Sequence, residues 1–293
     1  MTETERNGIR IGYLCATLCA VLYGFMPLFT KIAYANGSDV LNVSFFRFFF
    51  CALFSLPIAW YRKEMSPFFL NRRETRWMLL LAACYSTLPL TLYGSYRFIN
   101  ASLASALHFT YPVFVMILSV LVLRTPVEKT QIVCILLCMG GIVLLTQFDG
   151  RAGLWGIVLA MLSGLFYAFY VIALAKSGLK EMPMMKMVFW LSVFTSAVLF
   201  LIAVAMRNPI GTGLPLKATA AHMGLAFFST VFPLALFQRG LALVGAVKST
   251  LLSTFEPITG VLIGVFVFHD VLTLRIAAGI VLILASVVLL VKE

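Results

Sequence analysis

One carboxylic acid lies deep within an apolar stretch of this sequence. Of the eleven acidic residues, only Glu256 stands near the middle of such a stretch. A carboxylate in hydrocarbon is costly unless it is protonated, paired or hydrated. Pro257 cannot donate to the carbonyl of Ser253, and Ser249 lies one helical turn earlier, so a polar helical face is expected around the acid. Two interpretations stay open: a substrate or proton site, or an acid that bonds to a neighbouring helix at a kink.

Two further side chains could bind an ionic group. Arg47, in the motif SFFRFFF, is the one cation well inside an apolar stretch. Its guanidinium must reach a carboxylate, carbonyl oxygens, an aromatic face or a membrane interface, so it either faces a substrate or extends toward the interface. His108 is central in its own stretch, and Pro112 four residues later frees its carbonyl. That histidine is either a site residue or a packed, hydrogen-bonded one.

Aromatic residues with hydroxyl groups recur along the same stretches. They are candidates to line a cavity, although helix interfaces hold the same residue types. Prolines within apolar helices often mark bends that line cavities, and several of these tyrosines lie near such prolines. The candidate substrate-binding residues are Tyr23, Arg47, Tyr85, Tyr93, His108, Tyr111, Tyr167, Tyr170, Ser249, Ser253 and Glu256.

The composition determines what kind of protein must position these residues. Of its 293 residues, 62% are hydrophobic and 11% are charged, and the mean hydropathy is +1.02. Soluble domains carry about a quarter charged residues, so this chain cannot cover a globule with polar surface. A soluble enzyme, a disordered scaffold and nucleic-acid binding are therefore excluded. Enzyme motifs and Cys/His ligand patterns are absent, so no catalytic residue, cofactor or metal is expected.

The apolar stretches predict an all-α polytopic membrane protein with ten transmembrane helices. A spanning helix needs about 20 apolar residues, and polar or Pro/Gly-containing breaks divide the chain into segments of about this length. Short turns are predicted near Asn100 and Gly245. The predicted spans are 10–34, 39–60, 76–97, 101–123, 129–147, 153–174, 184–206, 218–241, 246–268 and 272–291.

The distribution of basic residues predicts the orientation in the membrane. With ten spans, 15 of the 22 Lys and Arg residues fall on the side of the N-terminus, six fall on the other side, and Arg47 lies within a span. Loops rich in Lys and Arg stay in the cytoplasm. Both termini are therefore predicted to be cytoplasmic.

Two parts of the sequence resemble each other at a nearly constant offset. Residues 11–26 match residues 155–170 at an offset of 144, including a stripe of small residues typical of close helix packing. Residues 105–118 match residues 250–263 at an offset of 145, which pairs Pro112 with Pro257. Five spans per half is an odd number, so two inverted five-helix repeats are predicted, over residues 1–148 and 149–293. Substrate is then expected near the midplane.

These features resemble the EamA-type transporters of the drug/metabolite transporter superfamily. The resemblance rests on ten spans in two halves, the SFFRF motif, and the segment from Phe255 to Leu290. It implies a secondary transporter, often an exporter, with a cavity between the first, third, fourth, sixth, eighth and ninth helices. The family usually has Gly-Glu at the end of the fourth and ninth helices. Here those positions read Arg124-Thr125 and His269-Asp270.

The sequence thus predicts an exporter of a small polar or amphipathic metabolite, such as an amino acid, that works by alternating access. Glu256 is the candidate for proton coupling or for a substrate amine, and Arg47 and His108 for an anionic group. The alternatives are a multidrug exporter of aromatic or cationic compounds, a membrane enzyme and a lipid flippase. The expected partners are a small-molecule substrate, the lipid bilayer and protons. The expected location is a bacterial cytoplasmic membrane.

Overall fold

A computed structural model describes residues 3–95, 98–99, 101–145, 153–211, 213–268 and 273–291. Within these ranges the chain forms helices and no β-strand. The α-helices are α1 (Glu3–Tyr23), α2 (Met26–Ala35), α3 (Val40–Tyr61), α4 (Arg72–Ser95), α5 (Ala101–His108), α6 (Tyr111–Leu118), α7 (Lys129–Leu145), α8 (Leu154–Ser177), α9 (Met184–Ala205), α10 (Leu216–Ala226), α11 (Phe232–Ser253), α12 (Glu256–Phe268) and α13 (Leu274–Val291). The short elements are η1 (Ser119–Leu123), η2 (Leu179–Glu181) and η3 (Phe227–Val231).

Each of the ten predicted spans is helical in the described part of the chain. Among the described residues, five helical segments are long and apolar enough to cross a membrane. They are Arg6–Ala35, Val40–Tyr61, Leu154–Ser177, Met184–Ala205 and Leu216–Val267. Further apolar helices, such as Lys129–Leu145, are shorter.

The longest of these segments turns back on itself at a glycine. Leu216–Val267 has 52 residues, which would extend about 78 Å as one straight helix, well beyond a bilayer core. Gly245 has a φ of +82°, a backbone conformation open to glycine but costly for other residues. The turn predicted near Gly245 is therefore confirmed.

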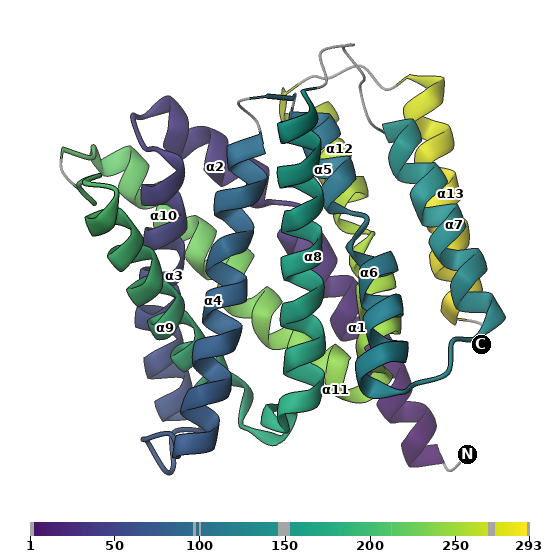
Figure 1. The fold of residues 1–293 in the computed structure, drawn as a ribbon, viewed down its shortest axis with the longest axis horizontal. Coiled ribbons are helices and arrows are strands. Elements are labelled where there is room, and N and C mark those ends of the chain that lie inside the picture. The colour runs from purple at the N-terminus through teal and green to yellow at the C-terminus, as the bar shows by residue number, and fades with distance from the viewer. Residues whose placement is uncertain are drawn as a thin grey trace.

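The helices pack as one bundle in which the two halves of the sequence interleave. The most extensive contacts join α1 to α11, α4 to α8, α3 to α9 and α7 to α13. Every one of these pairs combines a helix from before residue 148 with one from after it. Helix α1 begins at the lower right of Figure 1, and α13 ends above it in the lower half of the view. We call this end of the bundle the terminal end.

Small residues permit the close approach of these helices. Ala16 and Ala20 on α1, and Ala160 and Ala168 on α8, are completely buried. A Cβ atom on Gly164 would lie 2.8 Å from the carbonyl oxygen of His108, so α8 contacts the end of α5 through backbone atoms. This is the packing that the repeated stripe of small residues predicts.

Candidate functional site

Proline residues interrupt three of the predicted spans in the same way. In each case one helix ends four residues before the proline, and the next helix begins one residue before it. The reason is that proline has no N–H for the carbonyl at i−4, and its ring clashes with that carbonyl. The breaks are Tyr23/Met26 before Pro27, His108/Tyr111 before Pro112, and Ser253/Glu256 before Pro257.

The break before Pro257 lies where the sequence predicts a kink. Helix α11 ends at Ser253, and Glu256 is the first residue of the next helix, α12. Its carboxyl group therefore lies in the first turn of α12, where the helix dipole favours negative charge.

Arg47 lies where two of the irregular regions meet. Its Nε donates to Thr230 Oγ1 at 2.9 Å, its Nη1 contacts Met26 Sδ at 2.9 Å, and its Nη2 donates to the Ser229 carbonyl at 3.4 Å. Ser229 is four residues before Pro233, so that carbonyl is the one which the proline leaves without its helical donor. The guanidinium also lies 5.8 Å from the centroid of the Tyr23 ring. Arg47 therefore points into the bundle in this structure.

Arg47 and Glu256, two ionisable side chains of the interior, share one region. Glu256 is half-buried and interacts electrostatically with Arg47. A Cβ atom on Gly24 would lie 3.0 Å from the carbonyl oxygen of Glu256, so the break in α1/α2 contacts the start of α12 directly. Tyr111, at the start of α6, interacts with both Ser253 and Glu256. Three helix breaks and the η3 bulge thus converge on these two charges.

A chain of aromatic rings lines the same region. Tyr23 and Tyr85 are joined by a hydrogen bond of 3.1 Å between their hydroxyl groups. The ring centroids of Tyr85 and Tyr170 are 4.7 Å apart, and those of Tyr111 and Tyr167 are 4.6 Å apart. Tyr167 and Tyr170, at 6.0 Å, connect the two pairs. We call these five residues the tyrosine cluster.

One buried hydroxyl of the tyrosine cluster has no hydrogen-bond partner among the residues that the structure describes. Among the described residues, Tyr170 Oη and Ser249 Oγ have no hydrogen-bond partner although both are buried. Such groups cost free energy unless water or a ligand binds them. They are therefore positions where a polar molecule would be stabilised.

His108 is held from α8. Its Nδ1 lies 2.9 Å from Ser163 Oγ, and the hydroxyl of Ser163 donates to the carbonyl of Ala160 at 2.6 Å. Since Ser163 has a single hydroxyl hydrogen, His108 must donate from Nδ1. In the neutral ring Nε2 is then an acceptor. His108 stacks at an angle against Tyr111, with ring centroids 5.4 Å apart, so it borders the tyrosine cluster.

A cavity of about 700 Å³ lies beside the segments that follow α3 and α8. It is lined by the end of α8, the start of α9 and the segment of α11 from Gln238 to Ala242. Leu174, in its wall, is one turn beyond Tyr170, and Phe237, next to Gln238, is 6.1 Å from Tyr167 between ring centroids. The cavity thus approaches the tyrosine cluster to within about one helical turn. Its size is in the range of small-molecule sites.

The sequence model of the EamA-like transporter family matches residues 10–147 and again residues 154–292. The chain belongs to this family. The resemblance predicted from SFFRF and the C-terminal segment is therefore confirmed, and this EamA-like transporter is a multi-pass membrane protein.

Relatives of this EamA-like transporter carry similar names. An uncharacterized transporter of Archaeoglobus fulgidus is 29% identical over 97% of this chain and 98% of its own. A WAT1-related protein of Arabidopsis thaliana is 30% identical over 147 residues, which are 47% of this chain and 40% of its own. A crystal structure of another protein has a TM-score of 0.81 over 95% of both chains, with 13% identical residues, and it shows the shared fold alone. These names indicate a transporter rather than an enzyme.

The structure brings together most of the residues that were predicted from the transporter's sequence. Arg47, Glu256, His108 and the tyrosine cluster share the interior, and Ser253 lies beside Tyr111. Ser249 is buried on α11. The side chain of Tyr93 and the pair His269-Asp270 lie outside the described residues.

The sequence analysis missed some polar groups of the site. Thr230 and the Ser229 carbonyl hold Arg47, and Ser163 holds His108. The position of Pro233 could have revealed the Ser229 carbonyl, because a proline lacks the N–H that would bond the carbonyl four residues earlier. The same rule relates Pro257 to Ser253. Gln238, whose amide oxygen and nitrogen are both buried without a partner among the described residues, had no such signal.

At the end opposite the terminal end, a polar contact joins the two halves. Asp39 caps α3 and accepts hydrogen bonds from the Asn42 backbone at 2.7 Å and from the Asn208 amide at 2.8 Å. The Asn42 side chain accepts from the backbone of Gly211 at 2.8 Å. Burial raises the pKa of Asp39, but the hydrogen bonds from Asn42 and Asn208 outweigh it and leave the pKa below its ordinary value of 3.8. We call Asp39, Asn42, Asn208 and Gly211 the polar latch.

Proposed function

We propose that this EamA-like transporter is a secondary active exporter of a small polar or amphipathic metabolite, such as an amino acid. The substrate binds between Glu256, Arg47 and the tyrosine cluster. The observation that carries this proposal is the convergence of three helix breaks and the η3 bulge on the two interior charges. Broken helices of this kind present backbone donors and acceptors at the membrane midplane, where transporters bind their cargo.

The chemistry of the site favours a molecule with both ionic and apolar parts. Glu256 would bind an amine, and Arg47, held by Thr230 and Ser229, would bind a carboxylate or phosphate in a fork geometry. The rings of Tyr85 and Tyr170 offer an apolar wall, and the Tyr170 hydroxyl is available as a hydrogen-bond donor or acceptor. A zwitterion of amino-acid size matches this pattern.

Proton coupling is assigned to Glu256. A carboxyl group in the interior can exchange a proton with only one side at a time if access alternates between the two ends. Each elementary charge that crosses the membrane is worth about 2.3 kcal/mol per 100 mV, close to a fiftyfold concentration ratio. The cavity beside the segments that follow α3 and α8 approaches Tyr170 and supports access from that side in this state.

Alternating access is proposed to rest on ten spans arranged as two inverted repeats, with both termini in the cytoplasm. The helical segments and the count of basic residues support this topology. Reporter fusions after Lys292 and at Asn208 should then report opposite sides of the membrane. Fusions that report the same side would contradict it.

A binding screen tests the substrate class. The purified protein is heated with a library of amino acids, amines and other metabolites, and a ligand at 100 times its Kd should raise the free energy of unfolding by about 2.7 kcal/mol. A ligand of this site should lose its effect with Glu256→Gln and keep it with Glu128→Gln, a change at a partly exposed acid outside the site. Stabilisation by aromatic cations alone would favour the multidrug alternative, which the aromatic walls also accommodate. Binders unaffected by Glu256→Gln would contradict the proposed site.

A further inference from the structure

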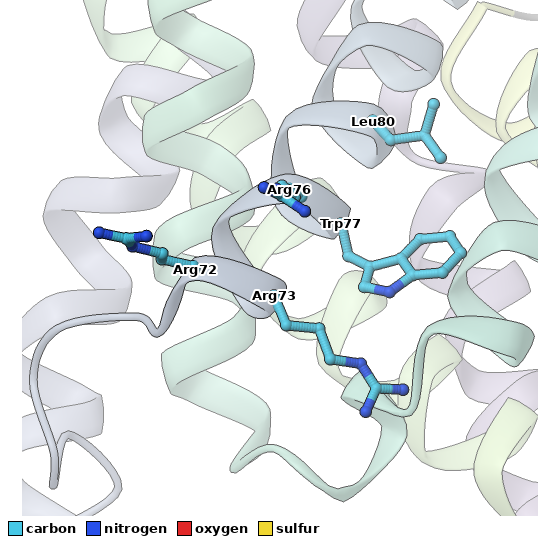
Figure 2. A pocket seen from close by; sticks show the side chains of 5 residues that line it. All are labelled: Arg72, Arg73, Arg76, Trp77 and Leu80. Carbon is cyan, nitrogen blue, oxygen red and sulfur yellow. The ribbon is translucent and has the colours of Figure 1, made fainter.

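Three arginines gather at the start of α4, away from the central site. Arg72, Arg73 and Arg76 are exposed, and with Trp77 and Leu80 they line a cavity of about 540 Å³. Figure 2 shows the three guanidinium groups around the first turns of the helix, with the indole of Trp77 and the side chain of Leu80 on one side. We call these five residues the arginine pocket.

No carboxylate neutralises these guanidinium groups within the described side chains. The ion pairs described at up to 4.0 Å involve only Arg62 with Glu64 and Lys248 with Glu128. Glu74, which lies between the arginines in sequence, is occupied elsewhere, because its Oε2 accepts the backbone N–H of Asn71 at 2.8 Å as part of the helix cap. The three guanidinium groups therefore have no ion-pair partner within 4.0 Å among the described side chains.

The pocket changes from charged to apolar along the helix axis. Leu80 follows Arg72 by eight residues, which is about 12 Å of helix rise. Leu79 and Leu80 are each 47% exposed, so this part of α4 faces hydrocarbon in a membrane. Trp77, which lies between the two zones, is a residue type that prefers the interface. The arginines are thereby placed at the depth of lipid headgroups.

We propose that the arginine pocket is a binding site for an anionic phospholipid. The phosphate would accept hydrogen bonds from the Arg73 guanidinium, which lies on the side of Trp77 in Figure 2, since guanidinium groups bind phosphate in bidentate geometry. Arg72 and Arg76 add positive charge on the adjoining surface of the same helical turns. The acyl chains would lie along Trp77 and Leu80. A soluble phosphate compound would use the arginines but would leave the exposed leucines without a role. This inference requires the membrane location of the chain and does not depend on the substrate of the central site.

The position of the arginine pocket in the bundle agrees with an anionic phospholipid as its ligand. Helix α4 begins at the terminal end, which is the cytoplasmic end in the proposed topology (Figure 1). The cytoplasmic leaflet carries the anionic lipids, and each Lys or Arg near it contributes about 1 kcal/mol, a factor of about five in binding. Three arginines are therefore sufficient for a strong preference over a zwitterionic lipid.

Native mass spectrometry of the full-length protein in mild detergent tests the site. The protein is titrated with phosphatidylglycerol or with phosphatidylcholine of the same acyl chains, and we expect phosphatidylglycerol to bind at least about tenfold more tightly. The variant with Arg72→Gln, Arg73→Gln and Arg76→Gln should lose most of this preference. The matched control carries Lys63→Gln, Lys129→Gln and Lys176→Gln, three exposed lysines at the same end of the bundle, and should keep it.

Several results would overturn the proposal. Equal binding of the two lipids by the wild-type protein would overturn it. An equal loss of the preference for phosphatidylglycerol in the triple lysine variant would also overturn it, because net charge alone would then attract the lipid. Glycerol 3-phosphate serves as the soluble probe, and binding as tight as that of phosphatidylglycerol would assign the pocket to a free phosphate compound. If the triple arginine variant does not fold, the three single variants replace it, and each should lower the preference about fivefold or less.

Discussion

At the scale of single residues, two ionisable side chains of the site lie beside helix interruptions at prolines. Arg47 reaches the Ser229 carbonyl four residues before Pro233, and Glu256 begins a helix one residue before Pro257. A charge within a membrane protein is stabilised by such local dipoles when it lacks bulk water. The positions of Glu256, Pro257 and Arg47 could be predicted from the sequence, whereas Thr230 and Ser163 as partners could not, because they lie about 180 and 55 residues away in the chain.

The shape of the Arg47 side chain is expected to matter as much as its charge. Its Nε, Nη1 and Nη2 reach three different groups, and one lysine ammonium cannot do so. Arg47→Lys should lower transport at least about tenfold without loss of folded protein. Arg10→Lys, at an exposed arginine of α1 outside the site and the cavity, is the control and should have little effect. Wild-type transport by Arg47→Lys, measured in proteoliposomes, would remove the guanidinium from the mechanism.

Two tyrosines of the cluster should respond in opposite ways to loss of their hydroxyl group. Tyr85→Phe removes the hydrogen bond to Tyr23 and should lower the free energy of unfolding by about 1–2 kcal/mol. Tyr170→Phe removes a buried hydroxyl without a protein partner among the described residues, so stability should stay equal or rise. Substrate binding should nevertheless weaken with Tyr170→Phe. A loss of stability equal to that of Tyr85→Phe, in thermal unfolding, would show a structural role instead.

At the scale of helices, prolines determine where helices are interrupted, and glycines determine where two helices pack closely. Prolines within apolar helices often mark bends. The structure breaks or bulges at Pro27, Pro112, Pro233 and Pro257, while α3 and α4 continue through Pro57 and Pro89. Pro89 and Pro233 are repeat partners at an offset of 144, yet only the latter adjoins a π-bulge. Tertiary packing, which the local sequence does not encode, decides between these outcomes.

The crossing of α7 and α13 gives a matched pair of glycine substitutions. A Cβ atom on Gly141 would lie 2.8 Å from the Gly279 carbonyl oxygen and 2.6 Å from Ile283, whereas one on Gly140 would meet only Leu282 at 3.6 Å. Gly141→Ala should therefore destabilise the protein by about 1–3 kcal/mol through overpacking. Gly140→Ala should be neutral or stabilise it by up to about 1 kcal/mol, because alanine favours the helix. Unfolding in detergent compares the two, and equal effects would contradict the close crossing.

The polar latch predicts a stability difference that depends on pH. The folded-state pKa of Asp39 is lowered, so its contribution is fully present above the ordinary value of 3.8 and is lost as the pH falls through the lowered pKa. Asp39→Asn keeps a helix cap but removes the charge. Wild type should be more stable than Asp39→Asn at neutral pH, and the difference should vanish in acid. When Asn208→Ala is present in both proteins, the stability difference between Asp39 and Asp39→Asn should be smaller. A stability difference that does not change with pH would exclude the Asp39 charge as its source.

At the scale of the whole molecule, the sequence predicted the helical segments better than their arrangement. The apolar segments, the turn at Gly245 and the family were all predictable, because hydropathy and glycine act locally. The pairing of α1 with α11 and of α3 with α9 was not, because it depends on contacts between distant parts of the chain. The interleaved halves explain why residues from both meet at Arg47 and Glu256. The division into repeats at residue 148 stays a prediction.

Efflux from proteoliposomes tests the central claim most directly, because the substrate need not be identified beforehand. Liposomes containing the transporter are loaded with a defined mixture of amino acids, amines and small acids, a pH gradient is imposed, and mass spectrometry identifies the compounds that leave. We expect at least one compound to leave faster than from empty liposomes, and we expect Glu256→Gln, which fixes the neutral form, to abolish its response to the gradient. Release of the same compounds at the same gradient-driven rate by wild type and Glu256→Gln, or no protein-dependent release at all, would contradict the account.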